Sequence, residues 1–176
     1  MDQSLYVGID VAKDRLDVHL DALDKSFSCT NNQRACKALA KCLGTHNPTL
    51  IVMEASGGYE RIAASQLAAA GLPVAVVNAR QVRDFAKATG QLAKTDAIDA
   101  VVLAHFAQVI KPKVRPLPTD QEQLLKDLLA RRHQLIAMRT AETNRMHQAH
   151  YPRLKASIQT IIDAINEQIE ALDKQI

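Results

Sequence analysis

The hydrophobic period of the chain changes once, near residue 30, and this change constrains the fold more than any other feature. Three short apolar stretches, 5–11, 15–22 and 25–30, follow one another with only a few residues between them. Within 15–22 apolar and polar residues alternate, as in a strand with one buried face. Links this short join antiparallel neighbours, so we predict a three-stranded meander with 25–30 at the sheet edge.

After residue 30 helical and strand patterns alternate. The helical patterns cover 33–43, 59–70, 79–89 and a segment from about 93 to 110. Two further strands, 49–56 and 72–78, are almost wholly apolar, which is typical of strands covered on both faces. Crossovers through helices make such strands parallel, so we predict a mixed five-stranded α/β sheet of order 3-2-1-4-5 with helices on both faces. This arrangement matches the ribonuclease H-like fold.

The second part of the sequence has a different character. Three prolines fall within 111–118, which we interpret as a linker. Thr119 and Glu122 have the spacing of a capping box, and a long helix is predicted to follow. From Ile158 onward apolar residues recur in alternating steps of four and three, the pattern of a coiled-coil seam. We therefore predict an α/β domain over 1–110, a linker over 111–118 and a helical, coiled-coil arm over 119–176.

The charge is distributed unevenly along the chain. Residues 1–78 carry a net charge of −1, residues 79–155 carry +7, and residues 156–176 carry −3. A basic middle section is compatible with a nucleic-acid partner, but on charge alone a solvated basic face is the simpler explanation.

The sequence also indicates the cellular compartment. The sequence shows neither a signal peptide nor an apolar run long enough to cross a bilayer, so we expect a cytoplasmic protein with no membrane partner. The three cysteines lack metal-ligand spacing, and we interpret them as reduced thiols.

Four acidic residues carry the functional hypothesis. Asp10 and Glu54 each end a predicted strand, and adjacent parallel strands would place both carboxylates at the switch point of the sheet. Asp96 and Asp99 are three residues apart, so they are neighbours on a helix that could pack across this crevice. Clustered carboxylates repel one another unless cations offset the repulsion, and oxygen ligands select Mg²⁺ or Mn²⁺. Two such ions about 3.5–4 Å apart would support phosphodiester cleavage or transfer.

Each acid also has a structural interpretation. Asp96 and Asp99 could be a helix cap and a partner of the helix dipole. Asp10 could be a turn residue, whereas Glu54 ends an apolar strand, where an acid needs a partner. The agreement in topology among the four favours a site. His147 and His150 fit a solvated helix face better than a metal site, because no third ligand is evident.

Four motifs in order give the sequence a family resemblance. "YVGIDVAKDRLDV", "MEASGGYE", "VVNARQVRDFAKATG" and "AKTDAIDAVVLAHF" resemble the N-terminal part of the DEDD transposases of insertion sequences, relatives of the Piv-type DNA invertases. The resemblance covers residues 5 to about 110 and extends loosely through the arm. It implies a RuvC-like catalytic domain with the tetrad Asp10, Glu54, Asp96 and Asp99.

The resemblance also implies an activity and partners. The implied activity is magnesium-dependent DNA strand cleavage and exchange during transposition. The implied partners are a structured guide RNA and further copies of the chain, which form a dimer or tetramer joined partly through the coiled-coil arm. The expected setting is a bacterial or archaeal cytoplasm, on the nucleoid when bound to DNA. The family carries a further C-terminal domain with a nucleophilic serine. This chain ends before it, so we do not expect the chain alone to complete recombination.

Basic residues of the middle section are candidates for contacts with phosphate backbones. The nucleic-acid candidates are Arg80, Arg83, Lys87, Lys94, Arg131 and Arg132, with Arg139 and Arg145 farther along the same long helix. Aromatic residues make up only 3% of the chain, which argues against base stacking as the main mode of recognition. An RNA stem or an RNA–DNA hybrid read by its backbone fits better.

Other classes of protein remain open from the sequence. A RuvC-like structure-specific nuclease would use the same acids, and a non-catalytic module could bind nucleic acid or oligomerise only. The "GIDVAKDRLDV" stretch also resembles the first phosphate loop of sugar kinases and actin-like ATPases. Those folds need a second half with another glycine-rich loop, and we find none in this sequence.

Overall fold

A computed structural model describes residues 4–90 and 96–176, and the side chains of all of these except 96–98. The chain divides into two compact units, Met1–Leu117 and Pro118–Ile176, and each is considered by itself below.

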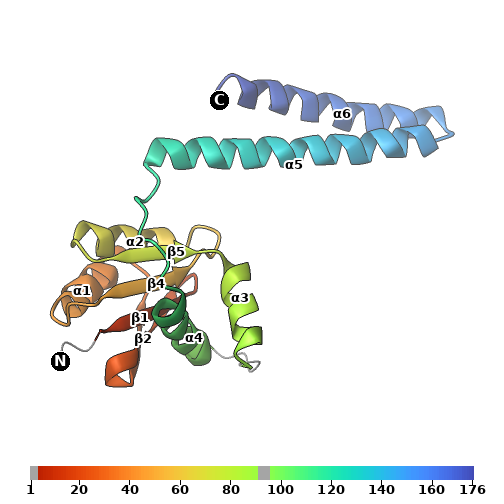
Figure 1. Ribbon diagram of the computed structural model, residues 1–176. Helices are drawn as coiled ribbons and strands as arrows, with labels where there is room; N and C mark the ends of the chain where they lie inside the picture. The colour runs from red at the N-terminus through yellow and green to blue at the C-terminus, as the bar shows by residue number, and fades with distance from the viewer. Residues whose placement is uncertain (1–3, 91–95) are drawn as a thin grey trace. The chain divides into compact units, whose positions relative to one another are not determined.

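The first unit is built on a five-stranded sheet (Figure 1). Its strands are β1 (Tyr6–Val11), β2 (Arg15–Leu20), β3 (Lys25–Thr30), β4 (Leu50–Glu54) and β5 (Val74–Val77). The order is β3-β2-β1-β4-β5, as predicted. The first three strands pair antiparallel, whereas β1–β4 and β4–β5 pair parallel. The edge position predicted for β3 is confirmed.

Helices cover both faces of this sheet. They are α1 (Gln33–Gly44), α2 (Glu60–Ala69), α3 (Ala79–Ala88) and α4 (Asp96–Ile110), with a short 3-10 turn, η1 (Asp21–Leu23), between β2 and β3. Strand β2 ends at Leu20 instead of the predicted residue 22. The chain turns there because the Asp21 carboxylate accepts hydrogen bonds from the backbone N–H groups of Tyr6 (2.8 Å) and Ala22 (2.6 Å).

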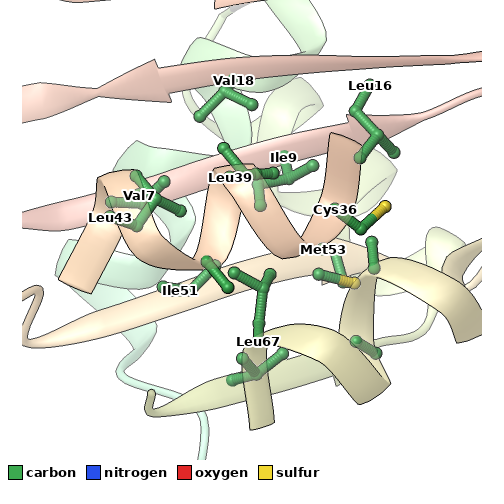
Figure 2. Packing of buried hydrophobic residues seen from close by; sticks show 14 of the residues in the cluster. Val7, Ile9, Leu16, Val18, Cys36, Leu39, Leu43, Ile51, Met53 and Leu67 are labelled. Atoms are coloured by element: carbon green, nitrogen blue, oxygen red, sulfur yellow. The ribbon is translucent and has the colours of Figure 1, made fainter. Parts of the chain in front are cut away.

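The side chains of the strands divide into two cores. One face packs against α1 and α2, and Figure 2 shows Val7, Ile9, Leu16, Val18, Cys36, Leu39, Leu43, Ile51, Met53 and Leu67 in that core. The opposite face packs against α3 and α4 through Tyr6, Leu50, Val52, Val77, Val82, Leu103 and Phe106. This two-sided α/β arrangement is the ribonuclease H-like fold predicted from the sequence.

Gly8 is the point of closest approach between the sheet and α4. A Cβ atom built on Gly8 would lie 2.1 Å from the Ala100 carbonyl oxygen, 2.4 Å from the Ala104 nitrogen and 2.8 Å from Leu103 Cβ. Only glycine leaves room for this contact, because any side chain would meet the helix backbone. Helix α4 is therefore seated directly on the backbone of β1.

The second unit is a helical hairpin of α5 (Asp120–Gln148) and α6 (Pro152–Asp173). The predicted capping box at Thr119 and Glu122 is present at the start of α5. Leu135 of α5 packs with Ile165 and Ile169 of α6, both positions of the predicted seam. No helix in the described part of the chain is both long and apolar enough to span a membrane.

A candidate carboxylate site at the ends of β1 and β4

Two of the predicted acids stand at neighbouring strand ends. In the parallel pairing of β1 with β4, Ile9 lies opposite Met53, and the next residues along the two strands are Asp10 and Glu54. Ile9 and Met53 belong to the core under α1 and α2. Since side chains alternate along a strand, Asp10 and Glu54 lie on the other face, the one covered by α4. Both residues are half-buried.

Helix α4 brings a third acid toward this place. Its residues 100–104 lie at Gly8, and farther along Gln108 and Lys111 line a surface depression together with Ser4 and Tyr6. The helix therefore runs antiparallel to β1, with its first turn on the Asp10 side of Gly8. Two strand residues advance about 6.6 Å, close to the length of four helical residues, so the first turn of α4 is level with Asp10.

Asp99 is the described acid of this first turn, and it is half-buried. Asp96 is the first residue of α4, but its side chain lies outside the described part of the structure. Of the predicted tetrad, the structure thus brings Asp10 and Glu54 to adjacent strand ends. It also brings the start of α4, whose backbone carries Asp96 and Asp99, to the same end of the sheet.

The donor set suits a hard divalent cation, because carboxylate oxygens are the ligands that Mg²⁺ and Mn²⁺ prefer. Among the side chains described, which exclude those of 1–3 and 91–98, no group of three His, Cys, Asp or Glu residues is arranged to hold a metal ion. The described residues therefore show where the strand ends and the helix lie, but they do not define the ligands of a bound metal ion.

Asp17 is a fifth acid on the same face, and it was not among the predicted site residues. It pairs with Asp10 across the β1–β2 ladder and is only 6% exposed. Arg15 binds its carboxylate with two nitrogens, at 2.7 to 3.0 Å, and the Ser28 hydroxyl donates to it. Burial raises the pKa of this carboxyl, but the hydrogen bonds from Arg15 and Ser28 outweigh burial and hold the pKa below its ordinary value. Asp17 is therefore ionised at neutral pH.

The loop after Glu54 is organised by another carboxylate. Glu60 accepts hydrogen bonds from the Ser56 N–H (3.0 Å), the Ser56 hydroxyl (3.1 Å) and the Gly58 N–H (2.9 Å). Burial raises the pKa of Glu60, but these bonds outweigh it and lower the pKa below its usual range. Gly57 and Gly58 both have positive φ, which the turn requires. The strand predicted to extend to residue 56 ends at Glu54 because the chain enters this loop.

The predicted basic residues of α3 form an exposed stripe. Arg80, Arg83 and Lys87 are all exposed, whereas Val82 and Phe85 face the core. Phe85 packs edge-on against rings of α4, so this basic helix adjoins the helix that bears Asp99. Arg80 makes an exposed ion pair with Asp84 (3.8 Å), and the Arg83 Nε donates to the Ala79 carbonyl (3.3 Å). Lys94, another predicted contact, lies outside the described residues.

The basic residues of α5 differ in whether they contact α5 itself or α6. Arg131 is exposed and donates to Gln134 (3.2 Å). Arg132 instead binds Asp173 of α6 (2.5 Å), so its charge is partly used within the hairpin.

Two further arginines of α5 also have partners. Arg139 donates to Asn166 of α6 (3.0 Å) and Arg145 pairs with Glu142. His147 and His150 are both exposed, as predicted, but α5 ends at Gln148, so His150 lies beyond the helix.

Comparison with known proteins identifies the relatives of the chain. A sequence model of the DEDD transposases of the IS110 type matches residues 7–150. The pilin gene-inverting protein of Moraxella bovis is 32% identical over 147 residues, and that of Moraxella lacunata is 31% identical over 147 residues. Each match covers 78% of this chain and 46% of the relative, so the chain spans about half the length of the curated relatives it matches. The chain belongs to the IS110 family of DEDD transposases.

Proposed function

We propose that the first unit is the RuvC-like catalytic domain of a DNA recombinase, with Asp10, Glu54, Asp96 and Asp99 as ligands of two Mg²⁺ or Mn²⁺ ions. The observation that carries the proposal is the juxtaposition of Asp10 and Glu54 at adjacent parallel strand ends, on the face where α4 begins with its acid pair. Bound ions would activate the attacking oxygen and stabilise the leaving oxygen of a DNA phosphodiester.

The reaction of the whole protein is proposed to be DNA strand cleavage and exchange. Family membership supports transposition of an insertion sequence, and the names of the Moraxella relatives describe inversion of a pilin gene. Transposition and inversion share strand cleavage and rejoining, so one site serves either outcome. The complete reaction also involves the serine-bearing C-terminal domain implied by the family resemblance.

The basic stripe on α3 supports a nucleic-acid partner. Arg80, Arg83 and Lys87 project from the face opposite the buried side of the helix. We propose that the DNA substrate or the guide-RNA stem binds along this stripe. Lys94 and, in the arm, Arg131 and Arg132 are separate candidate contacts. The exposed apolar residues of α5, such as Leu124, support homo-oligomerisation through the arm.

The metal hypothesis is tested by thermal unfolding of the chain with and without Mg²⁺ or Mn²⁺. A ligand at 100 times its dissociation constant stabilises the folded state by about 2.7 kcal/mol. We expect the metal to raise the Tm of the unmodified chain, and we expect Asp10→Asn and Glu54→Gln to lose this increase. Asp14→Asn is the matched control, because Asp14 is an exposed acid in the turn after β1. Equal metal-dependent shifts in all four proteins would refute the site.

The nucleic-acid hypothesis is tested by the salt dependence of binding. Each phosphate contact that is removed should reduce the slope of log K against log salt by about 1. We expect Arg80→Gln with Arg83→Gln to weaken duplex binding and lower the slope by about 2. Arg34→Gln, which changes an exposed residue of α1 at the other face of the sheet, should leave both quantities unchanged. An unchanged slope in the double variant would remove α3 from the binding surface.

A further inference from the structure

Asn31, between β3 and α1, joins the two loops that follow the candidate acids. Its side-chain Nδ2 donates to the Ala12 carbonyl (2.9 Å) and to the Tyr59 carbonyl (2.9 Å). Ala12 directly follows β1 and stands two residues after Asp10. Tyr59 lies in the loop between β4 and α2, five residues after Glu54. A single amide group thus connects the chain beyond one acid to the chain beyond the other.

The chemistry of the contact is specific to a primary amide. One Nδ2 supplies two N–H donors, and here each donates to a different carbonyl. The Oδ1 atom lies 3.8 Å from the Cys36 thiol, which donates weakly to it, and this orients the amide. The Asn31 backbone N–H donates to the Asp14 carbonyl (3.0 Å), so the residue is also held by its main chain. An aspartate would place a carboxylate against two carbonyl oxygens and could donate to neither.

The contact lies beyond the direct pairing of β1 with β4, although each acid is still paired on its outer side, Asp10 with Asp17 of β2 and Glu54 with Val77 of β5. The last aligned pair of the β1–β4 ladder is Ile9 with Met53, and the acids stand one residue beyond it. Past this pair, Glu60 holds the Ser56–Gly58 turn together internally, but it does not connect that turn to β1. The Asn31 amide supplies a direct connection between the two loops.

We propose that Asn31 is a positioning residue that fixes the separation of Asp10 and Glu54 for metal binding. The inference rests on the proposed metal site at these acids. Removing the amide leaves both strands paired but removes this direct connection, so the two loops should move more independently of each other. Substitution of groups that orient metal ligands typically weakens metal affinity by roughly 10–100-fold.

The decisive measurement is the Mn²⁺ affinity of the full 176-residue chain, followed by the electron paramagnetic resonance signal of free Mn²⁺. We expect Asn31→Ala and Asn31→Asp to raise the Kd by roughly 10-fold or more. Asn32→Ala is the matched control. The Asn32 side chain caps α1 by accepting a hydrogen bond from the Ala35 N–H (2.9 Å). Removing this cap should destabilise the fold without removing a bond between the two loops. If the Asn31 and Asn32 variants bind Mn²⁺ equally well, Asn31 has no positioning role.

Hydrogen exchange separates this inference from the proposed function. The amides of Ala12, Ser56 and Gly58 are hydrogen-bonded within the two loops. Asn31→Ala should accelerate exchange in both loops together, and Asn32→Ala in neither. Unchanged exchange in the Asn31 variant overturns the connection whether or not metal binds. An unmodified chain that binds no Mn²⁺ contradicts the metal site instead, and accelerated exchange without a change in Mn²⁺ affinity overturns positioning.

Discussion

Replacing Gly8 by alanine tests how α4 is seated on the sheet. The new methyl group would lie 2.1 Å from the Ala100 carbonyl oxygen and 2.4 Å from the Ala104 nitrogen, whereas ordinary contacts begin near 3.4 Å. Both obstacles are backbone atoms in the middle of a helix, so no side-chain rotation relieves the clash. The helix must move away from β1 by more than 1 Å at this point.

The energetic cost follows from two opposing effects. Overpacking a tight core costs about 1–3 kcal/mol, occasionally more, and the two backbone clashes favour the upper end. Replacing glycine within a strand recovers about 0.5–1 kcal/mol, because alanine loses less conformational entropy on folding. The free energy of unfolding should therefore fall by about 2 kcal/mol. The same displacement moves Asp99 relative to Asp10, so stabilisation by metal should fall as well.

Urea unfolding followed by far-ultraviolet circular dichroism measures this change. Gly44→Ala is the control of opposite sign. A Cβ atom at Gly44 would meet nothing within 4 Å, and the residue ends α1, where alanine favours the helix by up to about 1 kcal/mol. If Gly8→Ala unfolds within about 0.5 kcal/mol of the unmodified chain, α4 does not rest on the backbone of β1 and the placement of Asp99 fails with it.

Two further predictions concern other parts of the chain. The lowered pKa of Glu60 means that its ionised form stabilises the fold above the ordinary carboxyl pKa of about 4.3, and that this contribution disappears as the pH falls through the lower folded-state value. The stability difference between the unmodified chain and Glu60→Gln should therefore be larger at pH 6 than at pH 3 in urea titrations, and a constant difference would contradict the assignment. In the arm, Leu135→Ala should destabilise the hairpin by about 2–4 kcal/mol because Leu135 is 4% exposed, whereas Leu129→Ala, at 38% exposed, should cost much less. Equal losses in thermal unfolding would show that the two leucines are equally buried.

The strand order followed from the sequence because two kinds of periodicity are visible in it. Short links after 5–11 and 15–22 require antiparallel pairing, and apolar strands separated by helices require parallel crossovers. The positions of Asp10 and Glu54 then follow from topology, since each acid ends its own strand. The exact ends of the strands were less predictable from the sequence. Strand β2 ends where the Asp21 carboxylate accepts hydrogen bonds from backbone N–H groups, and hydrophobic periodicity does not reveal such bonds.

The remaining parts of the site depend on long-range geometry. Asp17 was recognisable as polar by its alternation with Leu16 and Val18, but its place beside Asp10 depends on the β1–β2 register. Gly8 looks like any strand glycine until the helix that packs on it is known. Asn31 acts through carbonyl groups of two distant loops, and a carbonyl leaves no signature in the sequence.

The topology of the sheet also has a consequence for the order of folding. Strands β1 and β2 form a local hairpin, whereas β1 and β4 pair only after β2, β3 and α1 have been traversed. Hairpins form in about 1–10 μs, while pairings between distant segments must first overcome the entropy of closing a long loop. Asp10 and Asp17 can therefore meet early, and Glu54 joins them only when the nonlocal pairing closes. Variants that slow this closure should delay the appearance of the proposed metal-binding state more than the appearance of secondary structure.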